Sequence, residues 1–137
     1  MVFGTFDVLH SGHINFFRQA RKLSANAYLI VSVARDVNVK KIKGLPPRRR
    51  EKSRLGAVKK CALVDRALLG GIKDYISHII KQKPEIIALG YDQTAYIKNL
   101  KPLLAQKGLK VKIVKLKAYY PKIYKSSLVA KTNSSRH

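Results

Sequence analysis

Two histidines three residues apart, His10 and His13, are the side chains in this chain best suited to act on a charged ligand. They lie in the segment GTFDVLHSGH, which joins a short apolar stretch to a helical pattern that begins near Ser11. A turn of this kind directs backbone N–H groups and the positive end of a helix toward a phosphate. Both imidazoles can face one ligand there and donate hydrogen bonds to charge developing on phosphate oxygens.

Other interpretations of this turn stay open. The spacing His-x-x-His also occurs in metal sites, but no cysteine or carboxylate cluster completes a ligand set here. The two histidines could also be structural. Gly4 and Gly12 allow a close approach of the backbone to a ligand. The turn is not a P-loop, because the chain contains no G-x-x-x-x-G-K-[ST] motif.

Strand-like and helix-like patterns alternate along the chain and would position this turn. Residues 28–34 and 85–89 are rich in β-branched or aliphatic side chains, as in buried strands, and residues 51–62 and 74–81 have helical spacing. A brief helical turn is expected near residues 37–41. Residues 110–116 alternate lysine with aliphatic residues, as in an edge strand. This order predicts an α/β fold, a doubly wound parallel sheet of about five strands with helices on both faces.

Three of the seven acidic residues, Asp7, Asp36 and Asp92, follow predicted strand ends. Ligands of a doubly wound sheet bind beyond the carboxyl ends of its strands, where loops lead into helices. The placement therefore indicates a ligand site at that edge. Aspartate is also common in loops and at helix caps for structural reasons alone, so both interpretations stay open.

Basic residues dominate the charge of the chain. Its 137 residues include 29 Lys+Arg and 7 Asp+Glu, for a formal net charge of +22. Eight of the basic residues lie between positions 40 and 54, where Glu51 is the one acid, and no acid follows Asp92. Such runs are usually solvated faces or mobile loops, but they also suit a wall beside an anionic ligand. Nucleotide phosphates, nucleic acid and an acidic membrane face all fit this balance.

Length and composition indicate one globular domain over residues 1–137, with a basic C-terminal segment at 117–137. No apolar stretch approaches the roughly 20 residues of a membrane span, and the N-terminus lacks a signal pattern. Cys61 is the only cysteine, which excludes an internal disulfide and a multi-cysteine zinc site. We therefore expect a cytoplasmic protein without a membrane partner.

Four segments resemble one known family. GTFDVLHSGH resembles the signature of the nucleotidylyltransferase superfamily, the cytidylyltransferase-like proteins, whose hallmark is a His-x-Gly-His turn. VARDVNVKKIKG, SRLGAVKKCALVDRALLG and KPEIIALGYDQT are similar, in the same order, to segments of archaeal FAD synthases. Glycerol-3-phosphate cytidylyltransferases share the first motif and a related Gly-x-Asp motif, but the second and last segments favour the FAD synthase branch. The resemblance implies the Rossmann-like nucleotidylyltransferase fold.

The resemblance also implies a reaction. FMN would attack the α-phosphorus of ATP, and pyrophosphate would leave with the help of magnesium and without a covalent enzyme intermediate. Such a transfer needs positioning and charge stabilisation more than acid–base chemistry. His10 and His13 would stabilise the α-phosphate in the transition state. Thr5 and Phe6 would offer backbone contacts to the nucleotide, and Asp7 would order the turn.

Further site residues follow from the same resemblance. Lys41, or one of its neighbours Lys40 and Lys43, would neutralise phosphate charge, and Arg54 would do so with a planar fork of donors. The nucleotide or its sugar would meet residues of the first turn and of the GYDQ motif, namely Gly4, Gly90, Asp92 and Gln93.

The C-terminal motif departs from the family pattern. Cytidylyltransferases usually have an Ile-Ser-Thr-Thr-like turn preceded by arginine, and here the nearest match is Tyr124-Lys125-Ser126-Ser127. Hydroxyl groups at a helix N-terminus suit a phosphate, so Ser126 and Ser127 are expected to bind the nucleotide, although Ser126 could simply cap the helix.

Three alternatives and one assembly state complete the expectations. A CTP-dependent glycerol-3-phosphate cytidylyltransferase is the alternative within the family. Outside it, a basic nucleic-acid-binding protein fits the charge, although no RNA- or DNA-reading motif is present. A nonenzymatic nucleotide sensor is disfavoured by the intact His-x-Gly-His turn. The family resemblance also implies a homodimer.

Overall fold

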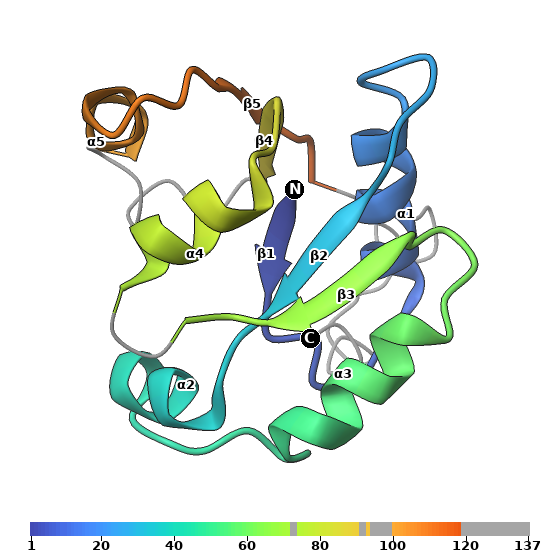
Figure 1. Ribbon diagram of the computed structural model, residues 1–137. Helices are drawn as coiled ribbons and strands as arrows, with labels where there is room; N and C mark the ends of the chain where they lie inside the picture. The colour runs from blue at the N-terminus through green and yellow to red at the C-terminus, as the bar shows by residue number, and fades with distance from the viewer. Residues whose placement is uncertain (72–73, 91–92, 94–99, 119–137) are drawn as a thin grey trace.

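Five strands and five helices form the part of the chain that the computed structural model describes, which is residues 1–71, 74–90, 93 and 100–118 (Figure 1). The strands are β1 (Val2–Gly4), β2 (Ile30–Val33), β3 (Arg66–Leu69), β4 (Ile86–Leu89) and β5 (Lys112–Lys115). The helices are α1 (Ser11–Arg21), α2 (Asp36–Lys43), α3 (Glu51–Lys59), α4 (Tyr75–Gln82) and α5 (Leu100–Gln106).

All strand pairs are parallel. β1, β2 and β3 are neighbours in that order, with Val2 opposite Val31 and Ile30 opposite Arg66, and β4 pairs with β5. The two groups meet at β1 and β4: the amino group of Met1 donates to the carbonyl of Ile86 at 2.8 Å, and the Ala88 N–H donates to the carbonyl of Met1 at 3.0 Å. The strand order is therefore β3-β2-β1-β4-β5, which confirms the predicted doubly wound sheet.

The core lies on both faces of this sheet because neighbouring strand residues point to opposite sides. Ala88 packs with Phe17 of α1 and Val58 of α3, whereas Ile87 packs with Ile79 of α4 and with α5. Figure 1 shows α1 and α3 on one side of the strands and α4 and α5 on the other. The expectation of helices on both faces is thus confirmed.

Some element boundaries differ from the sequence expectation. A brief helical turn was expected near residues 37–41, but α2 runs from Asp36 to Lys43 and ends at Gly44, whose φ of 82° is in the left-handed region that glycine tolerates. The expected lysine-rich edge strand is found as β5, which pairs only with β4 among the described strands. None of the described helices is long and apolar enough to cross a membrane.

Candidate active site

The carboxyl ends of β1 and β4 lie side by side in the middle of the sheet. Strands β2 and β3 follow on one side of β1, and β4 and β5 follow on the other, so the strand order reverses at this point. Gln93 joins the loops that follow these strands. Its side-chain oxygen accepts from the Gly90 N–H at 2.8 Å, and its side-chain nitrogen donates to the carbonyl of Phe3 at 2.8 Å. Ligands of doubly wound folds bind at this reversal point. Gly90 and Gln93 are therefore at the expected edge, while Asp92 lies outside the described residues.

The turn after β1 owes its shape to Phe6. Phe6 has a φ of 51°, a left-handed value that costs a non-glycine residue on the order of 1–3 kcal/mol. Its ring is buried, and its centroid lies 5.4 Å from that of Phe17 and 5.2 Å from that of His13, in an edge-on arrangement with His13. A Cβ atom on Gly4 would stand 2.6 Å from the Phe6 ring. Only glycine at position 4 leaves room for this ring.

The two histidines begin α1 and brace its first turn. Nδ1 of His10 accepts from the Gly12 N–H at 3.0 Å, and Nδ1 of His13 accepts from the His10 N–H at 3.3 Å. The two rings stack with centroids 4.0 Å apart. Because each Nδ1 is an acceptor, the neutral imidazoles carry their protons on Nε2. Both Nε2–H groups are therefore donors of the kind that an α-phosphate needs.

Asp7 ties this turn to the loop between α2 and α3. Its two carboxylate oxygens accept from the backbone N–H groups of Arg48 and Arg49, at 2.7 Å and 2.8 Å. The contacts involve the backbone of the loop only. As a result, the basic loop is fixed beside the histidine turn, and Asp7 orders more than the turn itself.

Arg54 is internal, which differs from the expectation that it meets a phosphate. Its side chain is fully buried, and its guanidinium donates to the carbonyl of Thr5 at 2.8 Å, to the carbonyl of Arg49 at 2.9 Å and to Oδ1 of Asp36 at 2.6 Å. Partial burial acts to raise the pKa of Asp36, but hydrogen bonds from Arg54 and from the Glu51 N–H outweigh it and hold that pKa below its ordinary value. Arg54 thus holds the histidine turn and the loop between α2 and α3 together from inside the fold.

Two acidic residues cap each other's helices, an arrangement that the sequence reasoning missed. Glu51 accepts from the Asp36 N–H at 2.8 Å, and Asp36 accepts from the Glu51 N–H at 3.2 Å. Glu51 also pairs with Arg35 at 3.3 Å. The starts of α2 and α3 therefore meet at one point. The available signal was an acidic residue at the first position of each helix, where negative charge is favourable.

The remaining predicted site residues are spread more widely. Lys40, Lys41 and Lys43 are exposed on the second half of α2, and none of them forms an ion pair in the part of the chain that is described. Ser126 and Ser127 lie outside the described residues. Among the residues that the structure describes, no group of three His, Cys, Asp or Glu side chains could hold a metal ion.

The chain is similar to one known protein family over nearly its whole length. The model of the cytidylyltransferase-like family matches residues 1–132. FAD synthase of Korarchaeum cryptofilum is 44% identical over 117 residues, which are 85% of this chain and 79% of the relative. FAD synthase of Thermoplasma volcanium is 39% identical over 131 residues, 96% of this chain and 90% of the relative.

One solved structure extends this likeness to three dimensions. A crystal structure described as the lipopolysaccharide core biosynthesis protein from Thermoplasma volcanium matches with a TM-score of 0.79 and 39% identity, over 88% of this chain and 96% of that one. The chain belongs to the cytidylyltransferase-like family, and its relatives include several proteins named FAD synthase.

Proposed function

We propose that this protein is an FAD synthase, an enzyme that transfers AMP from ATP to FMN and releases pyrophosphate. The observation that carries the proposal is the pair of stacked histidines, each with Nδ1 on a backbone N–H and its proton on Nε2, at the reversal point of the sheet. Relatives named FAD synthase are 39% to 46% identical over 82% to 96% of the chain, and they supply the choice of substrates.

In the proposed reaction a phosphate oxygen of FMN attacks the α-phosphorus of ATP. A new P–O bond forms, the bond from the α-phosphorus to the bridging oxygen breaks, and pyrophosphate leaves with that electron pair. Nε2–H groups of His10 and His13 donate to the α-phosphate oxygens as their charge grows. A single donor of this kind typically contributes a factor of about 10²–10³ to the rate.

The histidine turn and the loop supply the rest of the site. Thr5 and Phe6 present backbone to the nucleotide, and Arg54 and Asp7 act as positioning residues that hold this backbone. Lys41, with Lys40 or Lys43, offsets triphosphate charge. Asp92, Ser126 and Ser127 are proposed nucleotide contacts on the strength of the motif match alone.

Magnesium is proposed to arrive with ATP. Mg²⁺ usually keeps several water ligands and binds through substrate phosphates and one or two carboxylates, so it needs no protein cage. When bound, the ion neutralises charge on the leaving pyrophosphate.

The homodimer that the resemblance implies is a further proposal, and light scattering after size-exclusion chromatography tests it.

A product assay tests the proposal. Purified protein is incubated with FMN, MgCl₂ and either ATP or CTP, and the flavins are separated by chromatography. FAD formed with ATP supports the proposed function. A parallel reaction offers glycerol 3-phosphate and CTP. Absence of FAD with both nucleotides, together with formation of CDP-glycerol, would instead establish the cytidylyltransferase alternative.

A further inference from the structure

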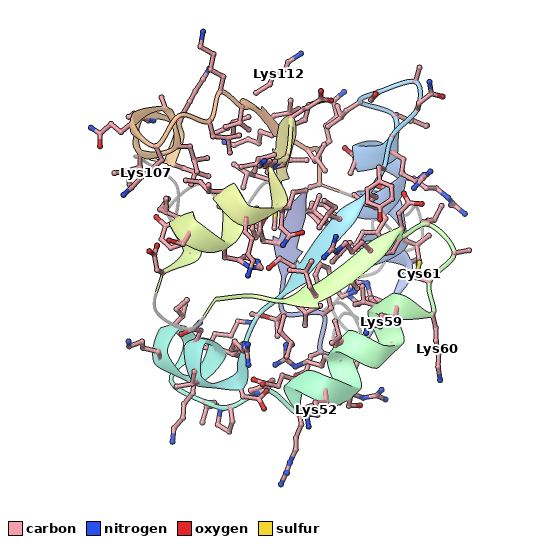
Figure 2. All side chains as sticks on the ribbon, in the orientation of Figure 1. Lys52, Lys59, Lys60, Cys61, Lys107 and Lys112 are labelled. Carbon is pink, nitrogen blue, oxygen red and sulfur yellow. The ribbon has the colours of Figure 1, made fainter. Side chains whose placement is uncertain are left out.

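We propose that the outer face of α3 and the arginine run that leads into it bind the phosphate backbone of nucleic acid. This basic face consists of Arg48, Arg49, Arg50, Lys52, Lys59 and Lys60, all of which are exposed. Figure 2 labels Lys52 on α3 and Lys59 and Lys60 at its end. The face takes no part in the proposed adenylyl transfer, which uses the histidine turn.

No carboxylate forms an ion pair with these cations within the described residues, although the charge of Arg50 helps to lower the pKa of Asp36. Three acids beside the arginine run have other partners for their carboxylates: Asp7 accepts the backbone N–H groups of Arg48 and Arg49, Asp36 pairs with Arg54, and Glu51 pairs with Arg35. The remaining described ion pair joins Arg21 and Asp65. The basic face therefore keeps a net positive charge for a ligand.

The backbone under the arginine run is held in place before any ligand binds. Asp7 accepts the N–H groups of Arg48 and Arg49, and the buried Arg54 donates to the carbonyl of Arg49. A surface with a fixed backbone loses less conformational entropy on binding than a mobile one. Only the side chains of the run need to become ordered.

The spacing along α3 suits a repeating anion. Lys52 and Lys59 are seven residues apart, which is close to two helical turns and about 10 Å along the axis. Phosphates of one strand follow each other at about 3.4 Å along a duplex axis, so this distance covers about three of them. A row of cations on this scale fits a polyanion better than a single phosphate group.

The same face is a poor match for a membrane. A helix that lies in a bilayer surface needs large apolar side chains beside its cations. α3 exposes none, because Val58 is wholly buried and the exposed large apolar residues of the described chain are on other elements. The nearest of these, Ile42 and Leu45, precede the arginine run. Nucleic acid is therefore the favoured partner.

Salt-dependent binding to DNA tests this proposal. A fluorescein-labelled duplex of about 20 base pairs is titrated with protein in about 50 to 200 mM KCl, and affinity is read from anisotropy. The test variant is Lys52→Gln/Lys59→Gln/Lys60→Gln. The control, Lys101→Gln/Lys107→Gln/Lys112→Gln, removes the same charge from exposed positions on α5, in the turn after it and on β5. Figure 2 places Lys107 and Lys112 far from α3.

Three lost phosphate contacts should reduce the slope of log K against log[salt] by about 2.7. When salt rises fourfold, the affinity of the parent chain for DNA should therefore fall about 40-fold more than the affinity of the α3 variant. The control variant should keep the slope of the parent chain, and circular dichroism should show that both variants are folded.

Three outcomes would overturn the proposal. Equal losses in the two variants would show that net charge alone attracts DNA. An unchanged slope in the α3 variant would place the contacts elsewhere. Binding to phosphatidylserine vesicles that excess DNA does not displace would identify a membrane surface instead. None of these readouts depends on FAD formation, so the result is separate from that of the product assay.

Discussion

Replacing Arg54 distinguishes a structural brace from a direct phosphate ligand. Arg54→Ala removes three hydrogen bonds from a fully buried guanidinium to Thr5, Arg49 and Asp36. At about 1.5 kcal/mol for each hydrogen bond from a charged group, the free energy of unfolding should fall by about 4.5 kcal/mol. The Asp36 carboxylate left behind is 37% exposed, so solvent screens it and no larger penalty is expected. With an unfolding entropy of about 0.3 kcal/mol/K for a chain of this size, Tm should fall by about 15 °C.

The assay is thermal unfolding of Arg54→Ala and Arg54→Lys, alongside kcat and KM for ATP. Lysine keeps the charge, but one ammonium cannot reach three acceptors on separate elements. The Tm of Arg54→Lys should therefore fall by more than half as much as the Tm of Arg54→Ala. Arg18→Ala, at an exposed position on α1, is the matched control and should leave Tm within about 1 °C. An unchanged Tm in Arg54→Lys with a raised KM for ATP would refute the internal role and restore direct phosphate contact.

Three further predictions follow from the same turn and from the sheet. His10→Asn keeps a side-chain cap on α1 but loses the imidazole donor, so kcat in the FAD assay should fall about 10²–10³-fold with little change in Tm; near-normal kcat would exclude the proposed role. Gly4→Ala places a Cβ 2.6 Å from the Phe6 ring and should lower the free energy of unfolding by about 1–3 kcal/mol, measured in urea, whereas an unchanged midpoint would mean that the ring moves freely. Burial lowers the pKa of His78 from its ordinary 6.5, so the folded chain binds this proton less readily than the unfolded chain, and stability should fall as the pH drops below 6.5. His78→Gln should show a flatter profile of Tm against pH than the parent chain. Burial lowers the pKa of the Met1 amino group to about 6, and both chains keep this contribution. Identical profiles for the two chains would contradict the reasoning.

Local periodicity was enough to predict the layers of this fold. The aliphatic run at residues 85–89 and the helical spacing of residues 74–81 are read from neighbours in the chain, and they became β4 and α4 nearly as expected. The histidine turn was predicted for the same reason, since its residues are contiguous. Gly44 marks the end of α2, but the helix before it has few apolar residues, so its full length was not apparent.

Contacts between distant segments were not predictable in this way. Nothing in the spacing of residues 35–54 shows that Asp36 and Glu51 cap each other's helices. Arginine is rarely buried, so a pattern places Arg54 on the surface. Its burial depends on three acceptors that come together only when the turn and both helices have formed. The sequence therefore predicts which residues belong to the candidate site, but not which of them hold its backbone in place.

The bracing of the basic loop has a consequence for how this family can diverge. Every described hydrogen bond that joins Arg48 and Arg49 to the turn uses their backbone atoms. Side chains at these two positions can therefore change over evolution without loosening the histidine turn, with proline as the exception because it lacks an N–H. The loop is a place where one member of the family can acquire a new surface while the chemistry beside it is conserved.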